Sequence, residues 1–507
     1  MKKYISDQID KQEISKWTPE QPVVITAGTG SGKSYFILNT LLKHAEENNE
    51  RILLLVPRVA IKEQFLNSLG VSSNGILIET YQWLEGLSLR EKSDLAFDYV
   101  VADEAHYFVQ EASFNKNTVY SWNWINECQA VKIYLSATPD KLLKIVSSNH
   151  MHYDFRETPS YIESVRFFRT PPEDKYSYVR EQLNHFLQTG EKAVVFVSSI
   201  LEGADLFKEF ESHSLFLCSS SQKHFSKLVD ERSKKPLIEN EYMVKQFLIT
   251  TSFLEYGVTI KDSSLKHIFF DGFYADSMAQ SLGRKRSINA NDNIVAHIAI
   301  PDGRAINGRI QDLKRKIKPL LEVLEGNDSD ILHTLYSDST SISGDEYRGI
   351  ALRYDDKDNV TVDINPLAVV DYQCSLEELQ ELQSKIKNES YYPNVSESLG
   401  TEEWYLAEEL EKTNQLNTLF EELTNVRLYD KEDRDMIINA IGLKKNYRQV
   451  RSIKALNEHL EQLKVGYTIF SRQDKSKTLV QDNETIKNHN YNKTYWIIKN
   501  VNKGDLS

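Results

Sequence analysis

A glycine-rich segment near the N-terminus has the residue types and spacing of a phosphate-binding loop. It reads Gly28-Thr29-Gly30-Ser31-Gly32-Lys33-Ser34 and follows the β-branched run 23–26. Glycines let successive backbone N–H groups converge on a phosphate, and the start of a following helix adds positive partial charge. Lys33 can reach the β- and γ-phosphates of a nucleotide, and the Ser34 hydroxyl can ligate Mg²⁺. The segment therefore predicts a nucleotide-binding site that uses magnesium.

Two adjacent carboxylates, Asp103 and Glu104, follow the apolar run 99–102. Ligands of an α/β sheet sit at the carboxyl ends of its strands. Asp103 can hold Mg²⁺ directly or through water, and Glu104 can orient and deprotonate the water that attacks a γ-phosphate. With the loop, these residues predict hydrolysis of a nucleoside triphosphate.

The elements that must position these residues alternate between buried strands and helices. Continuous apolar runs separated by helical patterns are typical of parallel sheets covered on both faces. The first set lies at 23–26, 52–56, 75–78, 97–101 and 131–135, and the second at 193–197, 214–217, 246–250, 267–270 and 294–298, closed by a helix at 310–324. The fold class is therefore α/β, with tandem parallel-sheet domains over 1–155 and 156–325.

The pattern changes after residue 325. Residues 347–372 alternate like a β-hairpin, and acidic helices are expected at 376–387 and 402–424, which makes 326–430 an accessory region. The last segment, 431–507, is expected to be an α+β extension compatible with a winged helix. Its expected elements are helices at 432–441 and 452–463 and strands at 467–470 and 495–498, paired across the basic loop 472–493.

Three motifs of the first domain together resemble a DEAD/DEAH-box protein of helicase superfamily two. They are the phosphate loop, Asp103-Glu104-Ala105-His106, and Ser136-Ala137-Thr138 directly after a strand. The resemblance implies two RecA-like lobes, with ATP and Mg²⁺ between them. It also implies that His106, Ser136 and Thr138 couple hydrolysis to lobe movement. Pro57, Arg58 and Thr80 are implied contacts to a nucleic-acid backbone.

The second domain extends the resemblance, which covers roughly residues 17–305. The segment 250–257 is similar to the fifth motif, with Thr251 six residues before Gly257, and 280–286 is similar to the sixth. The resemblance implies that Gln280, Arg284 and Arg286 act on the γ-phosphate, that Gly257 adjoins the nucleotide, and that Ser198 and Thr251 contact nucleic acid.

The second domain also departs from the family pattern. The family's sixth motif ends in Gly-Arg-x-x-Arg, whereas here Ser287 occupies the last position and the second arginine, Arg286, comes one residue early. Arg284 is therefore the better-supported finger. Such shortened forms resemble helicases of phages, plasmids and viral origin-binding proteins.

Charge is distributed unevenly along the 507 residues, whose net charge is −13. Residues 441–507 carry +7, residues 326–440 carry −17, and the first 325 residues carry −3. A basic tail favours nucleic acid as a partner, with DNA favoured over RNA, and its lysines and arginines would contact duplex phosphates. The acidic region is expected either to contact a protein partner or to hold the basic tail until DNA competes for it.

Composition excludes several classes of protein. There is no apolar run long enough for a membrane span, and three scattered cysteines do not form a disulfide framework or a zinc cluster. The expected location is the cytoplasm of a bacterial or phage-infected cell. The expected function is an ATP-dependent helicase or translocase acting on DNA in replication, recombination or mobile-element maintenance. Two alternatives stay open: an ATP-gated DNA-binding initiator or regulator that does not unwind, and an RNA helicase.

Overall fold

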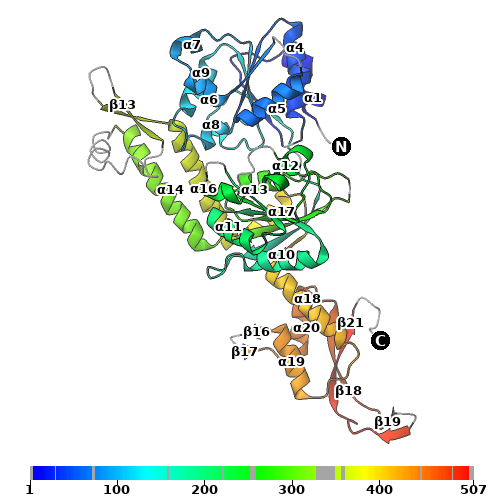
Figure 1. Ribbon diagram of the computed structural model, residues 1–507. Coiled ribbons are helices and arrows are strands. Elements are labelled where there is room, and N and C mark those ends of the chain that lie inside the picture. The colour runs from blue at the N-terminus through cyan, green and yellow to red at the C-terminus, as the bar shows by residue number, and fades with distance from the viewer. Residues whose placement is uncertain are drawn as a thin grey trace. The chain divides into compact units, whose positions relative to one another are not determined.

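The computed structural model describes residues 4–28, 30–70, 75–156, 159–219, 222, 224–251, 258–289, 291–326, 349–354, 360–445, 448–481 and 484–501. The chain divides into two compact units, Met1–Trp404 and Tyr405–Ser507. The larger unit contains two sheets, which we call the first lobe and the second lobe (Figure 1).

The first lobe is built on a six-stranded sheet in the order β3-β2-β4-β5-β1-β6, in which all pairs are parallel. Its strands are β1 (Val23–Thr26), β2 (Ile52–Val56), β3 (Ile76–Thr80), β4 (Tyr99–Ala102), β5 (Val131–Ser136) and β6 (Met151–Asp154). The residues of β1, β2, β4 and β5 are all buried, because helices cover both faces.

The helices of the first lobe divide between the two faces of the sheet. One face buries Val23, Ile25 and Leu54, and the other buries Val24, Leu53 and Leu55, which is the alternation expected of strands. The lobe's helices are α1 (Ile5–Gln8), α2 (Lys11–Ile14), α3 (Lys33–Tyr35), which continues through a π-helical turn (Phe36–Leu41) into α4 (Leu42–Glu47), α5 (Val59–Leu69), α6 (Tyr81–Gly86), α7 (Leu89–Ser93), α8 (Tyr107–Gln110) and α9 (Thr118–Glu127), with a 3₁₀ turn at Leu142–Lys144.

The second lobe is built on a seven-stranded sheet in the order β15-β7-β12-β11-β8-β10-β9. The pairs from β7 to β9 are parallel. Its strands are β7 (Ile162–Arg169), β8 (Lys192–Val197), β9 (Ser214–Leu217), β10 (Phe247–Thr251), β11 (Leu265–Phe270), β12 (Ile294–Ile300) and β15 (Trp404–Leu406). Its helices are α10 (Ser177–Thr189), α11 (Ile200–Glu209), α12 (Glu231–Asn240) and α13 (Ala275–Leu282), with a 3₁₀ turn at Phe225–Leu228.

Every apolar run expected to be a strand is one, so the expected pair of parallel-sheet α/β domains is confirmed. The sequence pattern missed β6 and β7. Strand β6 alternates between half-buried and exposed positions, β7 mixes buried, half-buried and exposed positions, and neither is a continuous apolar run.

The segment after β12 comprises α14 (Gly303–Leu324), β13 (Ile350–Tyr354), β14 (Val360–Ile364), α16 (Pro366–Lys387) and α17 (Tyr391–Ser398). Helices α14 and α16 pack against the first lobe, whereas α17 packs against β7 of the second lobe. Helices α14 and α16 lie side by side (Figure 1). Ile317 and Leu320 of α14, with Leu367 and Tyr372 of α16, join the apolar cluster on one face of the first sheet.

The expected hairpin over 347–372 is wrong in its second half. Strand β14 ends at Ile364, and the chain turns into α16 two residues later. The Asn365 side chain accepts a hydrogen bond from the Leu367 N–H, and Pro366 fills the first helical position, where its missing N–H costs nothing. The preference of these two residues for a helix start outweighs the alternating hydrophobic pattern of the residues that follow.

The C-terminal unit is the expected α+β extension. Its elements are α18 (Ala407–Glu422), α19 (Lys431–Ile441), β16 (Lys444–Lys445), β17 (Arg448–Gln449), α20 (Ile453–Gln462), β18 (Tyr467–Gln473), β19 (Thr478–Gln481), β20 (Glu484–Lys487) and β21 (Thr494–Asn500). The expected strand pair is confirmed: β18 and β21 are antiparallel, with Ile469 opposite Ile498. A separate apolar core joins Phe420, Ile437, Leu456 and Ile498.

The division between the units falls earlier than the boundary expected at 430/431. Leu416 and Phe420 of α18 are buried in the core of the C-terminal unit, so this acidic helix belongs there. No helix within the described ranges is long and apolar enough to cross a membrane.

Candidate nucleotide site between the lobes

The phosphate loop lies between β1 and α3. Gly30 and Gly32 have φ angles of 82° and 87°, in the left-handed region that favours glycine. The Ser31 hydroxyl donates to the Gly28 carbonyl oxygen at 2.7 Å and fixes the loop. Lys33 is the first residue of α3, and Ser34 is the exposed second residue. Thr29 lies outside the described residues.

Three adjacent strands bring the predicted residues of the first lobe together. The sheet order places β5 between β4 and β1. The phosphate loop follows β1, Asp103 and Glu104 follow β4, and Ser136 ends β5. Because all three strands are parallel, these groups meet at one edge of the sheet.

Lys33 and Glu104 form an ion pair of 2.6 Å, with side chains 12% and 25% exposed. Burial alone would raise the pKa of Glu104, but the Lys33 cation and its hydrogen bond lower that pKa to about 2. Glu104 also has a φ of 51°, which is unusual for a residue with a side chain. Such backbone strain is common at functional sites.

Asp103 has the properties of a magnesium ligand. It is buried, and burial raises its pKa to about 6. In the part of the chain that the structure describes, its Oδ1 atom has no hydrogen-bond partner. An orphaned carboxylate oxygen next to a phosphate loop fits a cation. The described residues contain no group of three or more His, Cys, Asp and Glu side chains arranged for a metal, but Mg²⁺ typically takes only one or two carboxylates, with phosphates and water completing its shell.

His106, Ser136 and Thr138 form a connected chain of polar contacts. His106 Nδ1 lies 3.0 Å from Ser136 Oγ, and the Thr138 N–H donates to the same oxygen at 3.1 Å. His106 Nδ1 also lies 3.5 Å from a Glu104 oxygen, and burial lowers the pKa of His106. The three residues predicted to couple hydrolysis to movement are therefore linked to Glu104.

The sixth-motif arginines flank an isolated β-bridge between Ile260 and Lys285 in the second lobe. The Ile260 N–H donates to the Arg284 carbonyl at 2.8 Å, and the Arg286 N–H donates to the Ile260 carbonyl at 3.0 Å. Arg284 lies in the turn that follows α13. Lys285, between the two arginines, is fully buried and pairs with Asp292 at 2.7 Å.

Arg286 reaches the first lobe's phosphate loop. A Cβ atom placed on Gly30 would lie 3.1 Å from Arg286 Cζ. The charge of Arg284 lowers the pKa of both Lys33 and Glu104, though each of those groups responds more strongly to burial and to its ion-pair partner. Lys33 and the two arginines thus share one site. Gln280 lies on α13, just before them, whereas Gly257 lies outside the described residues.

The predicted nucleic-acid contacts stand at strand ends in two neighbouring pairs. Pro57 and Arg58 follow β2, and Thr80 ends the adjacent β3; Ser198 follows β8, and Thr251 ends the adjacent β10. Some already have partners. Thr80 caps α6 through the Trp83 N–H, and Arg58 pairs with Glu111 at 2.8 Å.

Ser198 belongs to a polar cluster that sequence reasoning missed. Its hydroxyl donates to Asp271 at 2.8 Å and accepts from Lys175 at 2.7 Å. Asp271 follows β11 and also accepts from the Tyr176 hydroxyl at 2.7 Å. The sequence feature that could have indicated Asp271 as a site residue is its position directly after a buried strand.

Comparison with known proteins finds one family model that is similar to the first lobe. The family model described as "Type III restriction enzyme, res subunit" matches residues 2–73 and 70–141, which carry the phosphate loop and both carboxylates. No curated protein matches the chain.

Two solved structures are similar to part of this chain. Dbp5 of Saccharomyces cerevisiae, bound to RNA and ADP BeF3, is 16% identical with a TM-score of 0.42, over 57% of this chain and 81% of that one. The DEAH/RHA helicase HrpB of Escherichia coli is 16% identical with a TM-score of 0.41, over 59% of this chain. This chain spans 43% of HrpB, less than half of its length.

Proposed function

We propose that the protein is an ATP-dependent nucleic-acid helicase or translocase that acts on DNA. The observation that carries the proposal is the site shared by two lobes: Lys33 and Glu104 from one, and Arg284 and Arg286 from the other. When residues of both lobes bind one nucleotide, closure of the lobes depends on whether its γ-phosphate is present.

The residues have distinct roles in this proposal. An arriving triphosphate competes with Glu104 for Lys33, which releases the carboxylate to orient and deprotonate the attacking water. Arg284 and Arg286 stabilise the charge that develops on the γ-phosphate. Asp103 and the Ser34 hydroxyl would hold Mg²⁺, which neutralises phosphate charge when bound. Glu104 then signals through His106 to Ser136 and Thr138.

The choice of DNA rests on the basic C-terminal unit. Lys444, Lys445 and Arg448 are exposed on the β16–β17 hairpin, where they can contact duplex phosphates. A protein partner is proposed for the acidic 326–430 region.

Glu104→Gln tests the role of the base. We expect ATP binding to persist while kcat falls by about 10²–10⁴-fold, because shape is kept and the proton acceptor is lost. Lys33→Ala should abolish turnover by weakening phosphate binding. Glu79→Gln is the matched control, since Glu79 pairs with Lys62 at 2.7 Å in the same lobe. Normal turnover in Glu104→Gln would contradict the assignment.

Two further assays separate the alternatives. ATPase rates are compared without polymer and with duplex DNA, single-stranded DNA and RNA of the same sequence. Stronger stimulation by RNA would overturn the choice of DNA. Stimulated hydrolysis without strand displacement would instead indicate an ATP-gated DNA clamp.

A further inference from the structure

Helix α16 is anchored in the first lobe through its N-terminal half. Leu367, Ala368 and Val369 are buried in that lobe's apolar cluster. Just before the helix, the buried Asn365 amide donates to Thr118 Oγ1 at 2.7 Å and to the Asn115 carbonyl at 3.2 Å. The helix therefore moves with the first lobe.

One turn further on, α16 holds the loop that follows Ser136 and Thr138. Lys141 Nζ lies 2.6 Å from Asp371 Oδ1, with side chains 14% and 12% exposed. The same ammonium donates to the Ser375 hydroxyl at 2.8 Å. This contact ties the loop that leaves the coupling residues to the helix.

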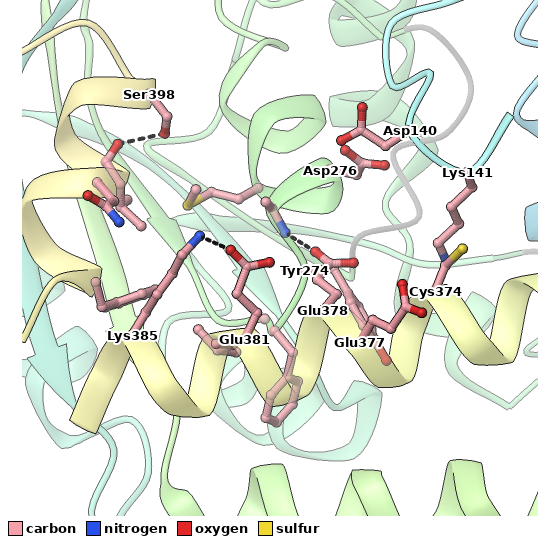
Figure 2. Close-up of a pocket in the computed structure, with 18 of the residues that line it drawn as sticks. Asp140, Lys141, Tyr274, Asp276, Cys374, Glu377, Glu378, Glu381, Lys385 and Ser398 are labelled. Carbon is pink, nitrogen blue, oxygen red and sulfur yellow. Dashed lines mark hydrogen bonds and ion pairs between the residues drawn. The ribbon is translucent and has the colours of Figure 1, made fainter. Parts of the chain in front are cut away.

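Two turns beyond Asp371, α16 holds an element of the second lobe. Glu378 Oε1 accepts a hydrogen bond of 2.9 Å from the N–H of Ala275, the first residue of α13 (Figure 2). Helix α13 carries Gln280 and ends two residues before Arg284. The Glu378 contact therefore sets where the helix with the second lobe's site residues begins.

A cavity lies beside Glu378. It has a volume of about 490 Å³ and is lined by α16, α17, α13 and the loop after Thr138. Glu377, Glu378 and Glu381 of α16 line it, with Asp140 and Asp276 on other elements (Figure 2). Its lining also includes Lys141, Lys144 and Lys385 and apolar side chains such as Phe273 and Leu382. At this level the Glu378 hydrogen bond stands beside a cavity rather than in a packed apolar core.

We propose that Asp371 and Glu378 are positioning residues, and that α16 acts as a clip between the two halves of the nucleotide site. Seven residues apart, they share one face of the helix, about 10 Å apart along its axis. Asp371 fixes the loop after the coupling residues, and Glu378 fixes the helix that leads to the arginines. The clip rests on the proposed function, since it sets the geometry of ATP hydrolysis.

The experiment separates nucleotide binding from turnover in the full chain. Asp371→Asn and Glu378→Gln are compared with Glu381→Gln, whose parent carboxylate pairs with Lys385 at 2.7 Å within α16. Affinity is measured with a fluorescent ADP analogue, and kcat at saturating ATP and single-stranded DNA. We expect the first two variants to keep ADP affinity within about twofold while kcat falls about tenfold or more. Glu381→Gln should change neither.

A double variant, Lys141→Met with Asp371→Leu, distinguishes positioning from stability. Replacing both members of a buried ion pair by apolar residues is often neutral in stability. We therefore expect a melting temperature near that of the wild type while kcat stays low. Recovery of kcat together with stability would show a purely structural pair and overturn the proposal, as would wild-type turnover in Asp371→Asn and Glu378→Gln.

Failure of the clip and failure of the proposed function give different results. Wild-type protein without ATPase activity contradicts the proposed function itself. Wild-type ATPase activity with unaffected α16 variants contradicts the clip alone. Should Asp371→Asn fail to fold, Glu378→Gln and the double variant still test whether α16 acts as a clip.

Discussion

At the scale of single residues, the contact between Gly30 and Arg286 is a tight link between the lobes at the nucleotide site. Gly30 has a φ of 82°, and a Cβ there would lie 3.1 Å from Arg286 Cζ. The glycine therefore serves two purposes: it permits the left-handed loop, and it leaves room for the guanidinium of the opposite lobe.

Gly30→Ala should lower both stability and turnover. A left-handed backbone costs a residue with a side chain about 1–2 kcal/mol, and the added methyl group displaces Arg286. For a lobe of this size, such a loss lowers the melting temperature by about 2–8 °C, which calorimetry measures. Gly28→Ala is the matched control for stability, since a Cβ there meets nothing within 4 Å. Equal melting temperatures for the two variants would contradict this account.

At the scale of elements, the start of α16 depends on one buried side chain. Asn365 is 1% exposed, caps the helix through the Leu367 N–H, and donates to three oxygens of the first lobe. A cap alone is worth about 1 kcal/mol, but buried acceptors left without donors cost more.

Asn365→Ala should therefore destabilise more than loss of an exposed cap. Asp302 caps α14 through the Arg304 N–H at an exposed position, so Asp302→Ala supplies the comparison. We expect a loss of about 1 kcal/mol for Asp302→Ala and about 2–4 kcal/mol for Asn365→Ala. Thermal melting in parallel measures the difference. A smaller shift for Asn365→Ala would show that its hydrogen bonds to the first lobe contribute little.

Strands made of continuous apolar runs were predictable from the sequence, and strands with mixed or very short patterns were not. Runs such as 52–56 are wholly apolar because both faces of the strand are covered. Strand β6 alternates, and only three residues form β15, so neither stands out as a run. The Lys141–Asp371 ion pair joins residues 230 positions apart, and no local pattern indicates such a pair.

Site residues were predictable from the sequence where they belong to one short motif. The loop, Asp103 and Glu104, and the Ser136–Thr138 segment lie close together, as their strand ends require. Their functional roles stay predictions, as do those of Pro57 and Ser198. An isolated bridge joins Lys285, between the two arginines, to Ile260, and a count of residues within the motif does not indicate this contact.

At the scale of the whole molecule, the basic tail 441–507 lies within a separately folded unit that begins earlier, at Tyr405. The C-terminal unit has its own apolar core, and its β16–β17 hairpin exposes Lys444, Lys445 and Arg448. Nucleic-acid binding by this hairpin should be electrostatic and should not depend on the nucleotide site.

Removing the hairpin charges should weaken DNA binding in a salt-dependent way. Every phosphate that the protein no longer neutralises reduces the slope of log affinity against log salt by about 0.9. The full chain with Lys444→Ala, Lys445→Ala and Arg448→Ala should therefore show a slope smaller by about 2–3, with basal ATPase unchanged. Fluorescence anisotropy over a salt series measures this, and Lys431→Ala on α19 is a single-charge control. An unchanged slope would place the DNA-binding surface elsewhere.

The buried ion pair between Lys285 and Asp292 anchors the residue that separates the two arginines, at its bridge to Ile260. An insertion or a deletion on either side of Lys285 would therefore displace one guanidinium relative to this anchor. The interior of the second lobe thus constrains how far apart Arg284 and Arg286 can stand.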